Sequence, residues 1–262
     1  MFDSNGTFIP NNDLNVFSYP TSDFYTYTSQ DTYKNLQNLS INFKLEAHLL
    51  ADSFQELAAT IANDRHFSLL LNGPWLPFCL PHTSNNDIGL RLENDLLPIL
   101  HKSLTSAFPD SHFKAVIQDK IQLLGRLLPR EETNYNKLIV SNLSSAIVGI
   151  YFPNVFNQFS VSSQVTAFNK IKSVSSSLKF CLSGPLEIAS ALIGAPNFLI
   201  HPNSYSPILI GSGAKHKDNR LISCFKSYGQ HLEFWVLSNN LTFGVEQISE
   251  QWTGGLCFYL PI

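Results

Sequence analysis

The chain has 262 residues, with 17 Lys and Arg against 20 Asp and Glu, so its formal net charge at pH 7 is −3. Charged residues make up 14% of the sequence, against about 25% in an ordinary soluble domain. A chain of this length buries enough surface to fold without a disulfide framework or a structural metal. The near-neutral balance of charge argues against nucleic-acid binding by electrostatics, because that requires a basic surface.

The start of the chain and its cysteines bear on where the protein resides. The first residues lack the cationic start and apolar core of a signal peptide, and no apolar run approaches the roughly 18 residues of a membrane span. Cys79, Cys181, Cys224 and Cys257 are far apart in the sequence and form no C-x-x-C pair, which is typical of free, buried thiols. We therefore expect a cytoplasmic protein that does not associate with membranes.

Residues 1–40 show neither helical nor strand periodicity and predict an irregular N-terminal arm. The arm contains many aromatic residues, among them Phe8, Phe17, Tyr19 and Phe24. So many apolar rings are unfavourable in a solvated tail, so we expect the arm to pack on its own body or on a neighbouring chain. A loosely docked extension is the alternative. Residues 41–262 are then the globular domain.

From residue 44 onward, apolar spacing alternates between helical and strand patterns. Leu50, Phe54, Leu57 and Ile61 repeat at the helical period. The patterns predict, in chain order, a helix over 44–64, a strand over 66–71, a helix over 94–108, a strand over 113–117, a short helix over 119–128, and strands over 138–140 and 146–152, the last ended by Pro153.

The last third of the chain is dominated by predicted strands. We expect strands over 178–182, 207–210, 221–228, 231–238 and 256–260, and helices over 186–194 and 243–251. The final strands follow one another through short connections rather than crossover helices. The sequence therefore predicts an α+β fold, a single globular domain with an antiparallel C-terminal sheet packed against helices.

The dipeptide Gly229-Gln230 predicts a two-residue type II′ turn between two of these strands. That turn fixes a register in which the following residues face each other on one side of the sheet: Tyr228 and His231, Lys226 and Glu233, Cys224 and Trp235, Ile222 and Leu237. The opposite side carries Phe225, Leu232, Phe234 and Val236, which we expect in the core.

The first side combines polar groups with an apolar wall, as a small-molecule site does. We expect His231, Glu233, Lys226 and Tyr228 to be the catalytic candidates, with the imidazole as general base because it titrates near neutral pH. Trp235 and Cys224 are the expected ligand-binding residues of the same face. The alternative is that this face is the wetter side of an antiparallel sheet, with Lys226 and Glu233 as an exposed pair.

Residues 211–217 combine a Gly-rich backbone with a local cluster of positive charge. Flexible amides with Lys215 and Lys217 suit an anionic group of a ligand. The segment lacks the spacing of a phosphate-binding P-loop and is followed by a strand, so no helix N-terminus assists it. An exposed hairpin connection is the alternative.

Cys79 and His82 lie three residues apart and could form a nucleophile and its base. This spacing is not diagnostic, and a buried structural thiol is the alternative. The eight His residues show no HxH, HxxH or HExxH spacing. The sequence therefore predicts no metal site, and it identifies no cofactor.

Two classes of function are compatible with these patterns, and the sequence leaves open whether the protein is an enzyme. The first is a protein that binds or transforms a small, largely apolar metabolite in a pocket over the C-terminal sheet. The second is a non-catalytic assembly or interaction subunit with large apolar interfaces. Sparse charge gives little repulsion between chains, so we expect a homo-oligomer, and the partner is a small apolar molecule or another protein chain.

Overall fold

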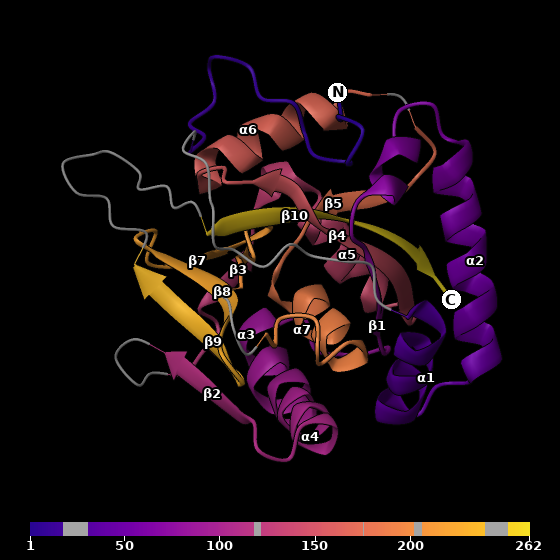
Figure 1. Ribbon diagram of the computed structural model, residues 1–262, viewed down its shortest axis with the longest axis vertical. Coiled ribbons are helices and arrows are strands. Elements are labelled where there is room, and N and C mark those ends of the chain that lie inside the picture. Colours follow the sequence, from indigo (N-terminus) through magenta and orange to yellow (C-terminus); the bar gives the residue numbers. More distant parts are fainter. Residues whose placement is uncertain (18–30, 118–121, 175, 202–205, 239–250) are drawn as a thin grey trace.

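The computed structural model describes residues 1–17, 31–117, 122–174, 176–201, 206–238 and 251–262. Helices in these residues pack against a curled β-sheet (Figure 1). One continuous hydrophobic core runs from Phe2 near the start of the chain to Tyr259 near its end. The chain is therefore a single α+β domain, as the sequence predicts.

The main sheet contains eight strands of the described residues, seven of them in the order β1-β4-β10-β6-β8-β9-β2, while β5 also pairs with β10. The strands are β1 (Leu76–Leu80), β2 (His112–Ile117), β4 (Ile147–Asn157), β5 (Phe180–Leu182), β6 (Ile208–Ile210), β8 (Leu221–Tyr228), β9 (His231–Ser238) and β10 (Trp252–Pro261). A separate small sheet pairs β3 (Leu127–Pro129) with β7 (Ala214–His216).

The sheet is mixed, whereas the sequence predicts an antiparallel one at the C-terminal end. The hairpin of β8 and β9 is antiparallel, but β10 pairs in parallel with β6, and β9 pairs in parallel with β2. Both parallel pairs join strands that are not consecutive in the sequence. Short connections between neighbouring strands could not reveal them, because strand order is set by packing.

The helices are α1 (Thr32–Phe43), α2 (Ala47–Asn63), α3 (Ile88–Arg91), α4 (Leu97–Ala107), α5 (Tyr135–Asn142), α6 (Val161–Lys172) and α7 (Pro185–Gly194). A π-helical turn (Leu92–Leu96) leads into α4. In Figure 1, α7 lies at the centre of the molecule, and it contacts strand β1 as well as helices α1 and α4.

All ten residues of α7 are buried, which suits a helix that is apolar on nearly every side. Its two polar side chains within the core are bonded. The Ser190 hydroxyl accepts from the Cys79 amide at 2.9 Å and donates to the Cys79 carbonyl at 2.6 Å. Glu187 accepts from the Gly184 amide at the N-terminus of the helix. The bonds of Ser190 fix α7 against strand β1, and the bond of Glu187 caps the N-terminus of the helix.

The predicted irregular arm is wrong for its last residues, because α1 begins at Thr32. Asp31 caps this helix by accepting from the Lys34 amide at 3.1 Å. Leu36 and Leu39 are buried, but the polar residues around them, among them Asn35 and Asn38, conceal the helical period. At the other end of the arm, Phe2 and Phe8 are buried in the core of the same chain, as expected.

Two short apolar runs predicted as strands are helical. The run over 66–71 contains a 3-10 helix (Ser68–Asn72), in which Phe67 and Leu70 are buried three residues apart while Leu69 is 42% exposed. The run over 138–140 belongs to α5, whose buried residues Tyr135, Leu138, Ile139 and Asn142 follow the helical period. Runs of three to six residues are too short to distinguish the helical period from the strand period.

Three further predictions concern the middle and the end of the chain. β4 continues through Pro153 to Asn157, whereas the prediction ends it at that proline. The predicted helix over 119–128 is wrong where it can be compared, because Leu127 and Leu128 belong to β3. Most of the predicted helix over 243–251 lies outside the described residues.

Candidate functional site

The hairpin of β8 and β9 has the register that its turn predicts. Gly229 has a φ of 58°, and the backbone pairs are Tyr228 with His231, Lys226 with Glu233, and Cys224 with Trp235. The opposite face is the predicted core, since Phe225, Leu232, Phe234 and Val236 are at most 2% exposed.

Three of the predicted site residues interact closely on the first face. Glu233 Oε2 accepts a hydrogen bond from Trp235 Nε1 at 2.7 Å and lies 3.5 Å from Lys226 Nζ. The Lys226 ammonium lies 3.9 Å from the centroid of the Trp235 ring, within the range of a cation–π contact. Lys226, Glu233 and Trp235 therefore each have a partner within the cluster. The same pairing is expected of a cluster that only stabilises the hairpin.

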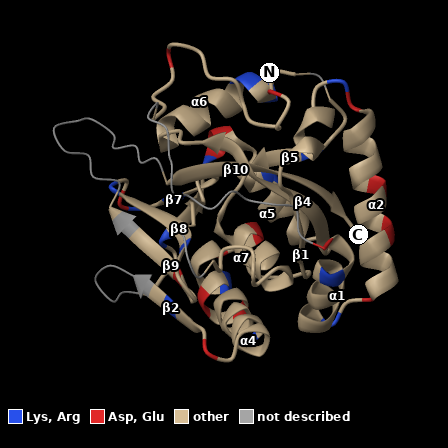
Figure 2. Ribbon diagram, in the orientation of Figure 1, with Lys and Arg blue, Asp and Glu red and all other residues tan. Residues whose placement is uncertain are grey.

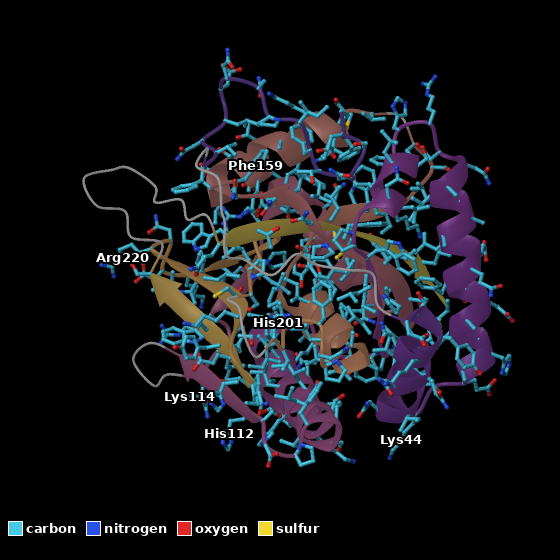
Figure 3. The ribbon with its side chains drawn as sticks, viewed as in Figure 1. Lys44, His112, Lys114, Phe159, His201 and Arg220 are labelled. Atoms are coloured by element: carbon cyan, nitrogen blue, oxygen red, sulfur yellow. The ribbon has the colours of Figure 1, made fainter. Side chains whose placement is uncertain are left out.

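The remaining predicted residues of this face differ in exposure. Tyr228 is 62% exposed at the turn, and the exposed His231 ring stacks on His112 of β2 with ring centroids 5.0 Å apart. His112 extends from the edge of the molecule (Figure 3). Cys224 is 1% exposed in a second apolar cluster with Ile210 and Trp252. The face therefore passes from solvent at the turn to a buried interior.

The predicted anion loop is divided between buried and exposed parts. Gly211 and Gly213 are buried, and the Gly213 amide donates to the Ser183 carbonyl at 2.7 Å. Lys215 and Lys217 are exposed, and the first belongs to strand β7. The glycines therefore allow close packing between segments. The two lysines are not on β8 or β9, the strands that carry Lys226, Glu233 and Trp235, because β7 pairs with β3 in the separate small sheet.

Cys79 lies in the interior of β1 and is fully buried, and burial raises the pKa of its thiol to about 12. The His82 ring is exposed, with Nε2 3.2 Å from the Leu143 carbonyl oxygen. A thiol in this setting is not ionised near neutral pH, so it is not an activated nucleophile. The structure favours the alternative of a buried structural thiol.

A buried polar cluster centred on Glu187 was not predicted from the sequence. Glu187 is fully buried, and its Oε2 accepts from the Tyr135 hydroxyl at 2.9 Å. Burial raises the pKa of this carboxyl to about 7, although hydrogen bonds from the Gly184 amide and Tyr135 oppose that effect. Cys181 of β5 and Cys257 of β10 lie opposite each other in the sheet as free thiols, and both are close to Glu187.

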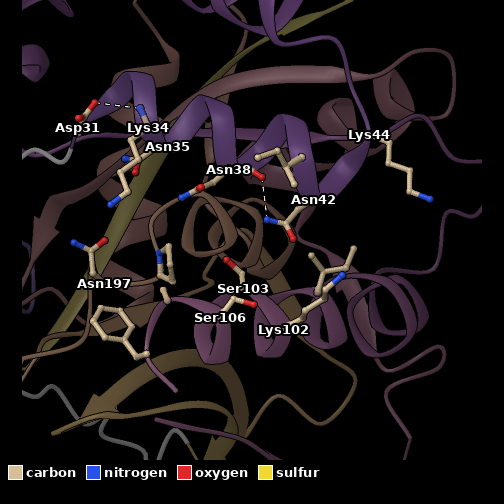
Figure 4. A pocket seen from close by; sticks show the side chains of 15 residues that line it. Asp31, Lys34, Asn35, Asn38, Asn42, Lys44, Lys102, Ser103, Ser106 and Asn197 are labelled. Atoms are coloured by element: carbon tan, nitrogen blue, oxygen red, sulfur yellow. Dashed lines mark hydrogen bonds between the residues drawn. The ribbon is translucent and has the colours of Figure 1, made fainter. Parts of the chain in front are cut away.

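The larger of two described cavities lies elsewhere, between α1, α4 and the C-terminal end of α7 (Figure 4). Its volume is about 800 Å³. We call it the α1–α4 cleft. Its polar lining includes Lys34, Lys44, Lys102, Asn35, Asn38 and Asn42. The i, i+3 and i+7 spacing of the three asparagines is a sequence signal that the irregular-arm prediction overlooked.

Several polar groups of the cleft stabilise the fold. Asn38 Nδ2 donates to the Gly194 carbonyl at 2.8 Å, and the Ser103 hydroxyl donates to the Ile193 carbonyl at 2.8 Å. These bonds satisfy two of the last carbonyls of α7. The three lysines differ, because none of them forms an ion pair with any other described residue. Asp31 is the one acidic side chain in the lining of this cleft.

Charged residues are otherwise spread over the described part of the chain, as Figure 2 shows. Within it, no three His, Cys, Asp or Glu side chains are grouped in a way that could hold a metal ion. None of the described helices is both long enough and apolar enough to cross a bilayer. Comparisons with models of protein families, with curated proteins and with solved structures find no match.

Proposed function

We propose that this protein binds a small anionic molecule in the α1–α4 cleft. The observation that carries the proposal is the set of three lysines, Lys34, Lys44 and Lys102, that line one cavity without ion-pair partners among the described residues. Their positive charge stands against one aspartate, in a chain whose net charge is −3. A cleft of one sign concentrates ligands of the opposite sign.

The size and lining of the cleft support a ligand with both charge and hydrogen-bonding groups. A volume of about 800 Å³ lies within the range of small-molecule sites. The asparagines and serines of the lining offer donors and acceptors, and Ile41, Ile99 and Phe108 offer apolar surface. A phosphate ester or a molecule with several carboxylates fits this lining better than the largely apolar metabolite expected from the sequence.

The test uses a double variant in which Lys34→Gln is combined with Lys102→Gln. The control is Lys137→Gln, which removes the charge of an exposed lysine on α5 outside the cleft. Binding of ribose 5-phosphate and citrate, with neutral ribose for comparison, is measured by calorimetry and melting temperature. A ligand at 100 times its dissociation constant stabilises the fold by about 2.7 kcal/mol. We expect the anions to bind and the double variant to lose that binding. Equal binding by the double variant and the control would refute the proposal.

The hairpin face remains a second candidate site for a small, largely apolar metabolite. The convergence of Lys226, Glu233 and Trp235 favours it, although none of these residues lines either described cavity. Trp235→Ala tests it, because the variant should lose the ligand-induced rise in melting temperature that an apolar metabolite library produces in the wild type. An unchanged rise would exclude this face.

We also propose, as the sequence suggests, that the protein could instead act as an assembly subunit. In that role it would form a homo-oligomer in the cytoplasm. One observation favours it. Among the described residues, β2 pairs on one side only, and an edge strand offers free backbone groups to another chain. Light scattering of the protein at tens of micromolar should give a molar mass of at least twice 29.3 kDa. A molar mass equal to that of one chain would count against an assembly role.

A further inference from the structure

Arg91, at the end of α3, carries a buried cation whose hydrogen bonding is incomplete. Its side chain is 4% exposed. Nη2 donates to Oδ1 of Asn142, whereas Nη1 is buried and has no partner among the described residues. The guanidinium also forms no ion pair with a described carboxylate. A buried cation without a counter-charge is strongly unfavourable, so the surroundings of Arg91 suit an anion that the chain itself does not provide.

Asn142 holds the guanidinium in a defined position. The Asn142 side chain is fully buried, and its Nδ2 donates to the carbonyls of Leu80, Pro81 and Ser145 at 3.1 to 3.2 Å. Because all three acceptors are carbonyls, the amide orientation is fixed and Oδ1 must face Arg91. Asn142 is therefore a positioning residue, which directs the guanidinium without neutralising it.

The acidic groups near Arg91 compensate its charge only in part. Burial lowers the pKa of Arg91, while the nearby acidic groups Tyr135, Asp95 and Glu187 oppose that effect. Asp95 lines the same pocket but is exposed and forms no ion pair with Arg91, so it offsets the charge of the guanidinium only in part. Glu187 is largely protonated below a pH of about 7. The guanidinium nevertheless stays protonated, as arginine does in proteins generally.

Arg91 lines a second cavity, of about 230 Å³, which we call the Arg91 pocket. Its apolar lining consists of Phe43 from α1, Leu80 and Pro81 from the end of β1, and Leu96 and Ile99 from the region of α4. His82, Thr83 and Asp95 complete the lining. An apolar cavity of about 150 Å³ holds benzene, so this pocket has room for a slightly larger group.

We infer that the Arg91 pocket binds the carboxylate of a small monocarboxylic acid, with Arg91 as the cation and the apolar lining around a short aliphatic or aromatic group. A carboxylate matches the planar guanidinium of Arg91, which lines the pocket, and supplies the counter-charge that it lacks among the described residues. A neutral molecule would leave the buried charge uncompensated. A dianion such as phosphate suits the pocket less well, because Asp95 repels the second negative charge.

This inference does not depend on the proposed function of the α1–α4 cleft. The two cavities share Ile99, but the lysines of the cleft are absent from the lining of the Arg91 pocket. Lys34→Gln combined with Lys102→Gln should therefore leave binding of a monocarboxylate unchanged. Failure of one proposal is thus distinguishable from failure of the other.

The experiment uses the full chain and measures binding of benzoate and hexanoate by calorimetry, with benzamide and hexanol as neutral counterparts and inorganic phosphate as the dianion. We expect the wild type to bind each acid at least ten times more tightly than its neutral counterpart. Arg91→Met should abolish that preference, because methionine retains an apolar side chain of similar length without the charge. Equal affinity of acid and neutral counterpart in the wild type would overturn the inference.

A second variant keeps the test decisive if Arg91→Met does not fold. Asp95 is exposed, so Asp95→Asn leaves the core intact while removing the negative charge of the pocket. We expect this variant to bind benzoate several times more tightly than the wild type, and its affinity for phosphate to rise as well. The matched control is Asp52→Asn on the exposed side of α2, which should bind as the wild type does. Unchanged affinity in Asp95→Asn would contradict the proposed site.

Discussion

Glu187 is a buried carboxyl whose ionisation opposes folding. Its pKa is raised from 4.5 to about 7, so the folded state holds a proton that the unfolded state has already lost between these two values. The free energy of unfolding therefore falls as the pH rises from about 4.5 to about 7. At about 1.4 kcal/mol per pKa unit, the loss is on the order of 3 kcal/mol above this range.

We expect Glu187→Gln to remove this pH dependence. Glutamine stays neutral and can still accept from the Gly184 amide. We expect the stability measured by urea unfolding to fall between pH 5 and pH 8 in the wild type. The fall should be smaller in the variant by about 2.5 kcal/mol. Glu56→Gln, on the exposed side of α2, is the control and should follow the wild type. An equal fall in Glu187→Gln would show that the carboxyl is not perturbed in this way.

The four cysteines should be unreactive in the folded protein. Each is at most 1% exposed, and burial raises the pKa of Cys79 and Cys224 to about 12. Because the thiolate is the reactive form, a disulfide reagent at pH 8 should modify no thiol in the native state and four thiols in guanidinium chloride. One thiol that reacts rapidly in the native protein would revive the interpretation of Cys79 as a nucleophile.

At the scale of elements, the β8–β9 hairpin depends on one glycine in its turn. Gly229 has a positive φ of 58°, and a Cβ added there would meet no atom within 4 Å. Replacement by alanine therefore tests backbone strain without steric clash. Gly229→Ala should cost about 1 kcal/mol and lower the melting temperature by about 2 to 4 °C.

The control for this turn is Gly229→Asn, because asparagine adopts the left-handed conformation more readily than alanine. It should lower the melting temperature less than Gly229→Ala does. If both variants melt as the wild type does, the turn adopts another conformation in solution. The hairpin register, and with it the cluster of Lys226, Glu233 and Trp235, would then need to be reconsidered.

At the scale of the molecule, one core connects both ends of the chain with the central helix α7. A single core predicts cooperative unfolding, even though many chains longer than about 150 residues populate intermediates. Guanidinium unfolding followed by circular dichroism and by tryptophan fluorescence should give one midpoint. Trp75 contacts Phe54 in the main core, with ring centroids 5.7 Å apart, while Trp252 belongs to the second apolar cluster.

A Trp75→Phe variant distinguishes the two clusters, because its fluorescence reports Trp235 and Trp252. Its fluorescence midpoint should coincide with the midpoint of circular dichroism. An earlier fluorescence transition would show that the second cluster unfolds separately, and the domain would then not be a single cooperative unit.

Local patterns in the sequence determined the α+β class, helix α2, the central helix α7 and the β8–β9 register. Each of these depends on a long apolar repeat or on turn residues that lie next to one another in the chain. Short runs were ambiguous, as residues 66–71 and 138–140 show, because three to six letters fit more than one period. The asparagines of α1 had the same effect, since they concealed the buried stripe of Leu36 and Leu39.

The cavities were decided by tertiary structure alone. The α1–α4 cleft joins Lys34 with Lys102 and Asn197, and the Arg91 pocket joins Phe43 with Leu80 and Ile99. These residues are far apart in the sequence and meet because α1 and α4 both pack on the buried helix α7. The sequence indicates which face of a helix or strand is apolar, but which faces meet, and what space remains between them, depends on how the elements pack together.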